Sequence, residues 1–495
     1  MSSSFLPLAR WRVKAAPGTL LRQWAQVGSS TLLGQALGVI SALAIRMLVS
    51  PAAMGIWQAC RLVLSYSNYA SLGVTKAAAR EWAVATGSGR FASARQAANV
   101  AWSFALGAAL AVSAGVLVLA WRKHSGGGPW AATWGLALLV VGLSVPLQRW
   151  VTFRVGLLRA TQQFHRTAAL GVLEALWHLA LGALGAWLGG AVGLCLAGAA
   201  GLVCSAWFLH RWSAPRPKLA WDAAIAGRLL RTGVPLVLGG TAFSLFRSLD
   251  KLMLLFYLPQ GEFALGCYSA ALLAQGQLFG LGNTLAGVLG PRLARRLGQS
   301  GSPAQVAAAA LQTTRALAVL LGGPAAAGVL LGPWVLGLLL PAYAPGLVAL
   351  PPLAAGALAL VLALPAQHAL VALDRPRRLL AVVLAACVAV ALGNHGVLRA
   401  GYALAGVGWI TCAVNWAFLL ALTSTAFASA IGWKKLLRQW LHLAWSVVPL
   451  GAALLVPGQD VYVLLLGLLG VLLLWIGVLY LHRRQLHEVL LTRES

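Results

Sequence analysis

Long apolar stretches, separated by short polar or charged segments, recur from one end of the chain to the other. A run of about 20 apolar residues is the length that an α-helix needs to cross the hydrocarbon core of a bilayer. The pattern therefore predicts an all-α polytopic membrane protein with about 14 transmembrane helices. The expected spans are 27–49, 55–75, 97–121, 131–150, 168–188, 190–210, 233–257, 262–287, 308–332, 346–372, 377–397, 403–427, 442–457 and 461–481.

The composition agrees with this pattern and excludes a soluble protein. Of the 495 residues, 60% are hydrophobic and 9% are charged, and the mean hydropathy is +0.82, whereas about a quarter of the residues in soluble domains are charged. The net charge of +28 would suggest nucleic acid as a partner of a soluble protein. In a chain as apolar as this one, we expect membrane lipid and no nucleic acid.

The positive charges follow the alternation of the expected spans. Of the 37 Lys and Arg residues, most fall in alternate connections, and with a cytoplasmic N-terminus only Arg122, Lys123 and Arg399 fall in outer ones. By the positive-inside rule, both termini are expected in the cytoplasm, which requires an even number of spans. The cations that fall inside spans are Arg46, Arg61, Arg247, Lys251 and Arg315.

Two of the expected spans carry charge deep inside the membrane. In the span 233–257, Arg247, Asp250 and Lys251 have helical spacings of three and four, which would place them on one face. An ionised side chain at mid-membrane costs about 2.5–3.5 kcal/mol on insertion scales, so such a face is expected to line a wet cavity. Arg61, followed by the polar run 66–69, predicts a second wet face in the span 55–75.

Three further ionisable residues each allow two interpretations. Arg46 lies near the outer end of the first span, so it either reaches the outer headgroups by snorkelling or faces the same cavity. Glu174 and His178 are four residues apart in the span 168–188. They form either a pair that satisfies itself or a proton-titrating element, because an isolated acid inside a span is driven towards its neutral form.

The other reactive residue types form no constellation. The 6 cysteines include no CxxC pair and no interleaved His, so we expect small apolar core residues and no metal site. The 9 acidic residues include no paired carboxylates in an inner loop, and no Gly-rich phosphate cradle is present. The sequence therefore predicts neither an enzyme nor a cofactor.

The longest inner connection divides the chain into two halves that resemble each other. Pro51 matches Pro259, Gly55-Ile56-Trp57 matches Gly266-Cys267-Tyr268, and Trp121 matches Trp334. Six spans separate the copies, so the halves are parallel repeats, which place a substrate path between two bundles. The expected organisation is a cytoplasmic tail (1–26), a six-helix bundle (27–210), a basic linker (211–232), a second six-helix bundle (233–428), an amphipathic connector (429–441), two extra helices (442–482) and a cytoplasmic tail (483–495).

Three turns carry a family resemblance. They are an outer turn, Leu-x-Pro-x-x-x-x-x-Leu-Gly-x-Tyr at 258–268, and two basic turns at 290–295 and 373–377. With these turns in order, the chain resembles, over about 27–428, the Wzx-like polysaccharide-transporter (oligosaccharide flippase) branch of the multidrug/oligosaccharidyl-lipid/polysaccharide exporter (MOP) superfamily. The resemblance implies a V-shaped pair of six-helix bundles in the bacterial inner membrane. It also implies transport of undecaprenyl-diphosphate-linked oligosaccharide from the cytoplasmic to the periplasmic leaflet, with polysaccharide polymerase and chain-length proteins as candidate partners.

The resemblance also implies roles for the charged residues. Arg61, Arg247, Lys251 and Arg46 would bind the diphosphate of a polyprenyl-linked glycan, because guanidinium groups donate to phosphate in pairs. Asp250 would balance one of these cations, and Glu174 with His178 would serve coupling to H⁺ or Na⁺. Two other members of the superfamily remain alternatives. They are a lipid II flippase and a cation-coupled drug exporter, although the first span lacks the acidic residue of the drug exporters.

Overall fold

The computed structural model describes residues 20–88, 91–161, 163–212, 217–287, 293, 302–456 and 461–483. Every regular element in these ranges is a helix, which confirms the all-α prediction. Nine of the described helices are long and apolar enough to cross a membrane. Most of the expected N-terminal tail, and almost all of the turn at 290–295 and of the C-terminal tail, lie outside the described residues.

The first half contains the helices α1 to α6, and one of its expected spans is interrupted. The span expected at 55–75 is longer and consists of two helices, because the chain turns through Leu72 and Gly73 with positive φ angles of 47° and 77°. The spans expected at 168–188 and 190–210 follow each other directly and are separated by a kink at Gly189 and Gly190. The elements are α1 (Leu20–Leu48), α2 (Pro51–Ser67), η2 (Asn68–Ser71), α3 (Val74–Ser88), α4 (Phe91–Ser125), α5 (Ala131–Ala160) and α6 (Phe164–Trp212).

The second half begins earlier than expected, because Asp222 caps the next helix by accepting a hydrogen bond from the backbone of Ile225 at 3.0 Å. The span expected at 233–257 is broken at Arg247 and Ser248. The elements are α7 (Ala223–Phe246), α8 (Leu249–Tyr257), α9 (Gly261–Gly287), α11 (Pro303–Leu339), η3 (Pro341–Tyr343), α12 (Ala344–Leu347), α13 (Leu350–Ala372), α14 (Pro376–Arg399) and α15 (Ala403–Ile431).

Three helices follow these two halves: α16 (Trp433–Ser446), α17 (Val448–Leu455) and α18 (Val461–Leu481). The amphipathic helix α16 continues to Ser446, past the expected end of the connector at 441. Pro449 lacks an N–H group and crowds the preceding turn, which explains the break at Val447. With 8 residues, α17 covers about 12 Å and cannot cross a bilayer alone.

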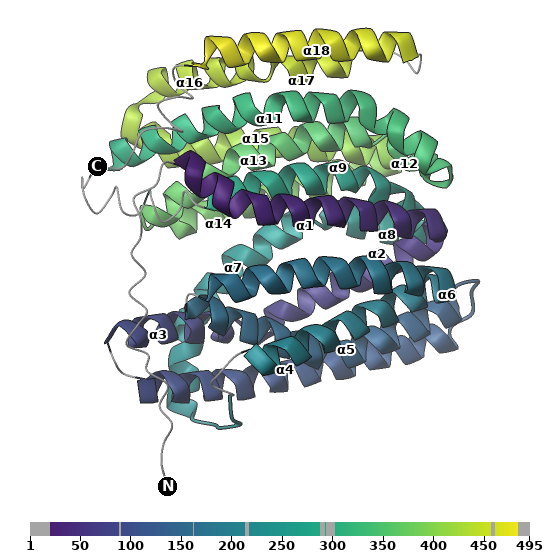
Figure 1. Cartoon of the computed structure of the whole chain (residues 1–495), viewed down its shortest axis with the longest axis vertical. Coiled ribbons are helices and arrows are strands. Elements are labelled where there is room, and N and C mark those ends of the chain that lie inside the picture. The colour runs from purple at the N-terminus through teal and green to yellow at the C-terminus, as the bar shows by residue number, and fades with distance from the viewer. Residues whose placement is uncertain are drawn as a thin grey trace.

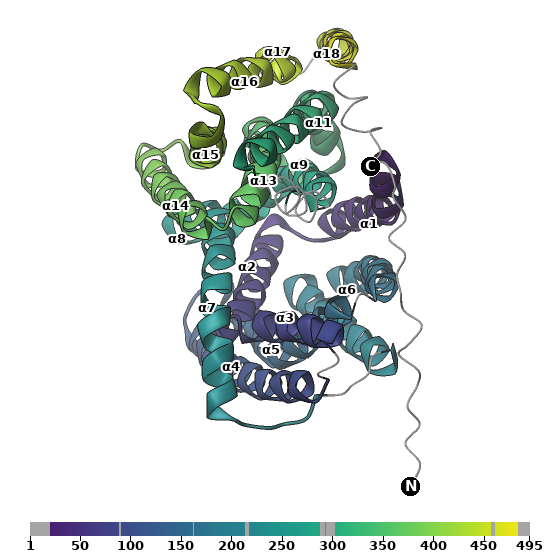
Figure 2. The ribbon, with the colours of Figure 1, turned by 90° about the vertical axis from the view of Figure 1, so that its left-hand side faces the viewer.

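The long helices run side by side in two groups, as Figure 1 shows. Helices α3 to α6 form one group together with α2, which packs against α5 and α6, and α9, α11, α13 and α15 form the core of the other. The groups meet where α1 packs against both α6 and α9 and where α2 packs against α9. Figure 2 shows α7 passing beside α3 and reaching the second group, where it packs against α14.

Two clusters of buried apolar side chains hold this arrangement together. In the second group, α13 is uncharged and almost completely buried, with Leu358 and Leu362 at its centre. Another cluster joins the two groups through Ile56 of α2, Leu265 of α9 and Leu350 of α13. The contact between the groups is therefore a packed apolar interface near the start of α2.

Candidate functional site

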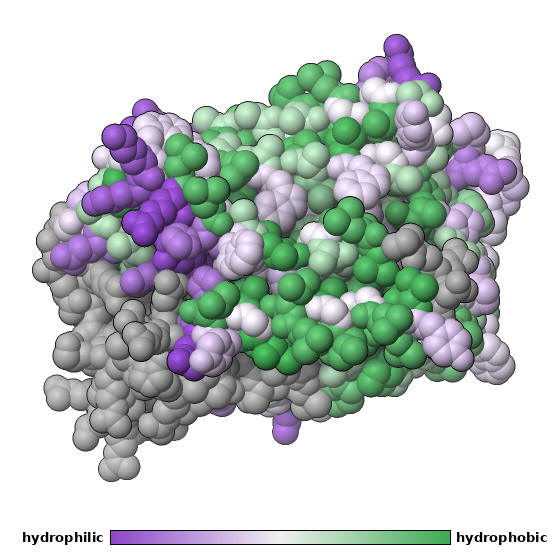
Figure 3. Space-filling model, turned by 90° about the horizontal axis from the view of Figure 1, so that it is seen from above, coloured by the Kyte–Doolittle hydropathy of each residue, from purple (hydrophilic) through white to green (hydrophobic). Residues whose placement is uncertain are grey.

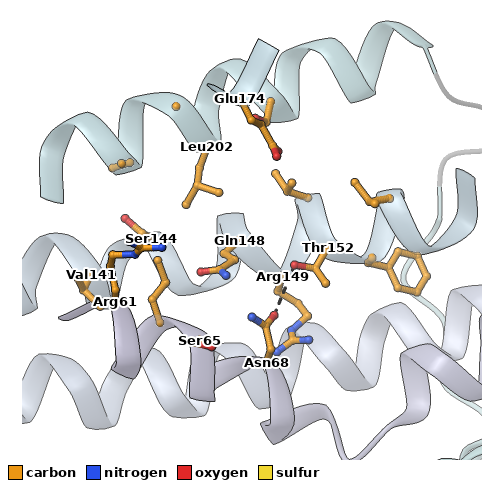
Figure 4. A pocket seen from close by; sticks show the side chains of 18 of the residues that line it. Arg61, Ser65, Asn68, Val141, Ser144, Gln148, Arg149, Thr152, Glu174 and Leu202 are labelled. Carbon is orange, nitrogen blue, oxygen red and sulfur yellow. Dashed lines mark hydrogen bonds between the residues drawn. The ribbon is translucent and has the colours of Figure 1, made fainter. Parts of the chain in front are cut away.

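A cavity of about 780 Å³ lies within the first group, between α2, η2, α3, α5 and α6. Polar and charged side chains face it from several of these elements, as Figure 4 shows. Thr152 of α5 donates to Asn68 of η2 at 3.4 Å across one side of the cavity. The polar and charged lining includes Arg61, Ser65, Asn68, Lys76, Ser144, Gln148, Arg149, Thr152, Arg159, Glu174 and His178.

Arg61 is positioned by the amphipathic character of α2. Ser50 caps this helix by accepting from the backbone of Ala53 at 3.4 Å, and Met54 and Ile56 near its start are completely buried. Trp57 and Arg61, four residues apart, face the cavity together, with the guanidinium 4.8 Å from the centre of the indole ring. The side chain of Arg61 is exposed, so it is accessible to a ligand in the cavity.

A second cavity, of about 340 Å³, brings four of the predicted site residues together. Arg46, Arg61, Glu174 and His178 all line it, and they come from α1, α2 and α6. Arg61 also lies within electrostatic range of both Arg46 and His178. Because Arg61, Glu174 and His178 line both cavities, they lie where the two meet.

Arg46 does not snorkel, so that interpretation of the sequence is wrong. Its side chain is only 5% exposed. Its guanidinium donates to the carbonyl of Ser269 at 3.0 Å, to the hydroxyl of Ser269 at 3.2 Å and to the carbonyl of Ala42 at 2.9 Å. The close packing of α1 against α9 provides the two acceptors of Ser269, so Arg46 joins the two groups of helices.

Glu174 and His178 do not bond to each other, so the interpretation that they form a self-satisfying pair is wrong. Among the contacts of the described residues, each meets a serine on another segment. The hydroxyl of Ser205 donates to Glu174 at 3.3 Å, and the hydroxyl of Ser41 lies 2.9 Å from Nδ1 of His178. Ser205 lies beyond the kink in α6, and Ser41 is on α1. Folding therefore gives each group a nearer partner, and both side chains stay exposed to the cavities.

Arg247, Asp250 and Lys251 lie at the break between α7 and α8, so they do not share one continuous helical face. The Arg247 guanidinium lies 3.8 Å from the centre of the Phe279 ring of α9. Asp250 is 3% exposed and accepts a hydrogen bond from the hydroxyl of Tyr268 at 2.9 Å. The ammonium of Lys251 donates to the carbonyl of Arg247 at 2.8 Å.

These three residues line neither of the two cavities described above. Their charges nevertheless interact, since Asp250 lies within electrostatic range of both Arg247 and Lys251. Lys251 is also within range of Arg61. Lys251 of α8 therefore interacts electrostatically with Arg61, a cavity residue of the first group of helices.

Arg149 is a cavity residue that the sequence did not single out. It was expected at the inner end of the span 131–150, but α5 continues to Ala160 and places it in the middle of a helix. Arg149 is 2% exposed and donates to the carbonyl of Ser67 at 2.6 Å and to the hydroxyl of Ser71 at 3.4 Å. It satisfies backbone that the break after α2 leaves open. The signal in the sequence was an arginine one turn after Pro146, inside an apolar stretch that continues as a helix.

The site offers cations and hydroxyls and no preformed metal centre. Within the described ranges, no group of three or more His, Cys, Asp or Glu is placed to hold a metal ion. All six cysteines are free. Five of them are buried, as expected of core residues, and Cys204 is half-buried. The arrangement can bind an anion reversibly, because Arg61 is exposed and has no hydrogen-bonded acid among the described residues.

Comparisons with known proteins agree with this geometry. A family model described as "Polysaccharide biosynthesis protein" matches residues 20–296. Comparison with curated proteins gives no match. Among solved structures, the chain is similar to the lipid II flippase MurJ in an inward closed conformation, with 11% identity and a TM-score of 0.69 over 93% of this chain and 99% of that one.

Two further solved structures share the fold. An inward-facing multidrug resistance MATE family transporter of the MOP superfamily has 14% identity and a TM-score of 0.59 over 85% of this chain and 95% of that one. A MOP superfamily transporter from Pyrococcus furiosus, described as having a binding pocket of reverse polarity, has 14% identity and a TM-score of 0.57 over 88% and 97%. The family match confirms the resemblance seen in the sequence: the chain belongs to the polysaccharide biosynthesis protein family and has the fold of the MOP superfamily.

Proposed function

We propose that the protein is a flippase that moves an undecaprenyl-diphosphate-linked oligosaccharide from the cytoplasmic to the periplasmic leaflet of a bacterial inner membrane. Family membership and the MOP fold support a flippase in general. The observation that carries the specific substrate class is that Arg46 of α1 and Arg61 of α2 line the same cavity. Arg61 is exposed to that cavity and has no hydrogen-bonded acid among the described residues, and such a cation in a membrane interior favours an anionic ligand.

The two cavities suit the two chemical parts of this substrate. Arg61 can donate two parallel hydrogen bonds to a phosphate, and its contact with Trp57 leaves the outer edge of the guanidinium free. Hydroxyl and amide groups such as those of Ser144, Gln148 and Thr152 line the larger cavity, and these groups suit sugar hydroxyls. Asp250 lowers the net charge near Lys251 and Arg247, which keeps the binding of a diphosphate reversible.

Alternating access requires that the two groups of helices separate on one side at a time. At the start of α2 they are joined by packed backbone and by the hydrogen bonds of Arg46. At the other end, α3 meets α7, where Gly73 and Gly233 are in backbone contact. We assign the first contact to the periplasmic side and the second to the cytoplasmic side, with both termini in the cytoplasm.

Glu174 is the group that we propose for coupling to protons. It is the only acid among the described residues that line the two cavities. Its hydrogen bond from Ser205 persists whether the carboxyl is charged or neutral, since either form accepts. A change in its charge would act directly on the field at Arg61, which lines the same two cavities.

A lipid II flippase is the second candidate. The similarity to the lipid II flippase MurJ extends over 93% of the chain. Both substrates are polyprenyl-diphosphate-linked sugars, so the cation site would serve either one. The two functions differ in which glycan-linked lipid is moved.

Reconstitution in proteoliposomes tests the proposed function. The vesicles would contain undecaprenyl-diphosphate-linked oligosaccharide or lipid II, and the fraction of each that becomes accessible to an external glycan-modifying enzyme would be measured. We expect transport of the oligosaccharide, loss of transport in Arg61→Gln, and normal transport in Arg95→Gln, which removes an exposed charge from α4. Transport of lipid II alone would favour the second candidate, and normal transport by Arg61→Gln would exclude the proposed site.

A further inference from the structure

Three helices far from the cavities, α11, α16 and α18, approach one another closely at one level. A Cβ atom on Gly322 of α11 would lie 3.2 Å from the carbonyl oxygen of Ser446 at the end of α16. A Cβ atom on the adjacent Gly323 would overlap the ring of Trp475 of α18. The indole of Trp475 donates to the carbonyl of Val319 at 2.7 Å. These contacts fix the relative positions of the three helices.

Four basic residues lie one or two helical turns from these contacts, and all four lie on the same side of them along the helix axes. Arg315 lies one turn before Val319 on α11, and His442 and Arg438 lie one and two turns before Ser446 on α16. His482 lies two turns after Trp475 on α18, which runs in the opposite direction. Under the topology expected from the charge distribution, this common end faces the cytoplasm.

These side chains interact with one another and have no acidic partner among the described residues. Arg315 interacts electrostatically with Arg438, and His442 interacts with both and with His482. The Nε atom of Arg315 is buried and makes no hydrogen bond within the described part of the chain. The salt bridge found in the described part of the chain joins Arg228 to Glu81, so it involves none of the four basic residues. Two arginine side chains within electrostatic range of each other, with no acid nearby, are more stable when an anion binds between them.

The surroundings identify the kind of anion. Figure 3 shows hydrophilic residues gathered at one end of the face that carries α16 to α18, directly beside an apolar surface. The exposed side of α16 adds Lys434 and Lys435, and its Trp433 and Trp445 are exposed, as in a helix at a membrane interface. The outer surface of α18 exposes Leu469 and Leu473, which can contact acyl chains.

We propose that Arg315, Arg438, His442 and His482 form a binding site for the phosphate headgroup of an anionic phospholipid in the cytoplasmic leaflet. Basic pockets between transmembrane helices on this side of a membrane recognise such headgroups. The site is separate from the proposed transport site, because α16 to α18 lie on the side of the second group that faces away from α3 to α6 (Figure 1). A lipid here would hold α16 and α18 against α11.

Thermal unfolding of the purified full-length protein in a neutral detergent tests this site. Increasing amounts of phosphatidylglycerol, phosphatidylcholine or inorganic phosphate would be added, and native mass spectrometry would count the bound lipids. We expect phosphatidylglycerol alone to raise the melting temperature, with one tightly bound molecule. Each cation near a membrane surface strengthens binding of anionic lipid about fivefold, so Arg438→Gln and Arg315→Gln should each weaken this binding by about that factor.

Arg95→Gln is the matched control, since it removes one exposed arginine charge from α4 and should bind phosphatidylglycerol as the wild type does. If Arg315→Gln fails to fold, Arg438→Gln carries the test, because Arg438 is exposed. An equal response to phosphatidylcholine or to inorganic phosphate would overturn the proposal. It would also fail if phosphatidylglycerol has no effect, and a lower melting temperature of Glu488→Gln would then assign the anion to the C-terminal tail.

Discussion

Gly55 of α2 and Gly266 of α9 form a reciprocal contact between the two groups of helices. A Cβ atom on Gly55 would overlap the carbonyl oxygen of Glu262, and a Cβ atom on Gly266 would overlap the carbonyl oxygen of Pro51. Gly266 is the repeat counterpart of Gly55, and the contacted residues, Glu262 and Pro51, each lie four positions before the glycine of their own helix. Each repeat therefore presents the same glycine to the same position of the other, as in a two-fold interface.

This relationship predicts that Gly55→Ala or Gly266→Ala will force α2 and α9 apart. Backbone atoms cannot move aside as a flexible side chain can, so the contact should lose about 1–3 kcal/mol, the usual cost of overpacking. Cys267, which is completely buried in α9, would report the change. In a variant that keeps Cys267 as its single cysteine, both substitutions should increase the rate of maleimide labelling.

Gly107→Ala is the control for these substitutions, because a Cβ atom at Gly107 of α4 would meet nothing within 4 Å. It should leave the labelling of Cys267 unchanged. If Gly55→Ala and Gly107→Ala label at the same rate, the glycine contact does not hold the two groups together.

Arg46 predicts a second test of the same interface. Ser269→Ala removes one of the three acceptors of Arg46 and leaves the carbonyl of residue 269 in place, so it should cost about 0.5–1.5 kcal/mol. Arg46→Met removes all three hydrogen bonds and should lower the melting temperature considerably more. A double-mutant cycle between the two positions should show clear coupling, whereas additive effects would mean that the contact between them is not formed.

The sequence was sufficient to predict an all-helical membrane protein, because a bilayer requires long apolar helices whatever their neighbours are. It did not predict the breaks in the spans expected at 55–75 and 233–257. It identified the charged residues inside spans, such as Arg61 and Glu174. It could not identify their partners, since the hydrogen bonds from Arg46 to Ser269 and from Ser205 to Glu174 depend on how distant segments pack. The break at Arg247 and Ser248 contains neither Gly nor Pro, the two residues that usually mark such breaks.

Arg149 predicts a structural role that can be separated from substrate binding. Its bond to the carbonyl of Ser67 stabilises the break between α2 and α3, and hydrogen bonds of charged groups are worth about 1.5–3 kcal/mol. Arg149→Met should therefore lower both the melting temperature and transport. Arg159→Met, which removes another cation of the same cavity, should leave the melting temperature nearly unchanged. Equal melting temperatures for the two variants would contradict this role.

Glu174 predicts a dependence of transport on the proton gradient. Glu174→Gln keeps the shape of the side chain and an acceptor for Ser205 but cannot exchange a proton. If Glu174 couples transport to protons, the variant should lose the stimulation by an imposed pH gradient while still binding substrate. Ser205→Ala, which leaves the carboxyl in place, should keep that stimulation. A Glu174→Gln protein that still responds to the gradient would assign coupling to another group.

Substitution of Gly233 should change the labelling of Cys267 in the opposite direction from substitution of Gly55. Gly233 lies in the other contact between the two groups, where α7 meets α3. A Cβ atom on Gly233 of α7 would overlap the backbone of Gly73, so Gly233→Ala should separate α3 from α7. Gly73 itself has a φ of 77°, where any side chain adds strain, so Gly233 is the cleaner position. If the two contacts open alternately, Gly233→Ala should favour the state in which α2 and α9 stay closed. Labelling of Cys267 should then fall below the wild-type rate, and a rise would show that the contacts open together.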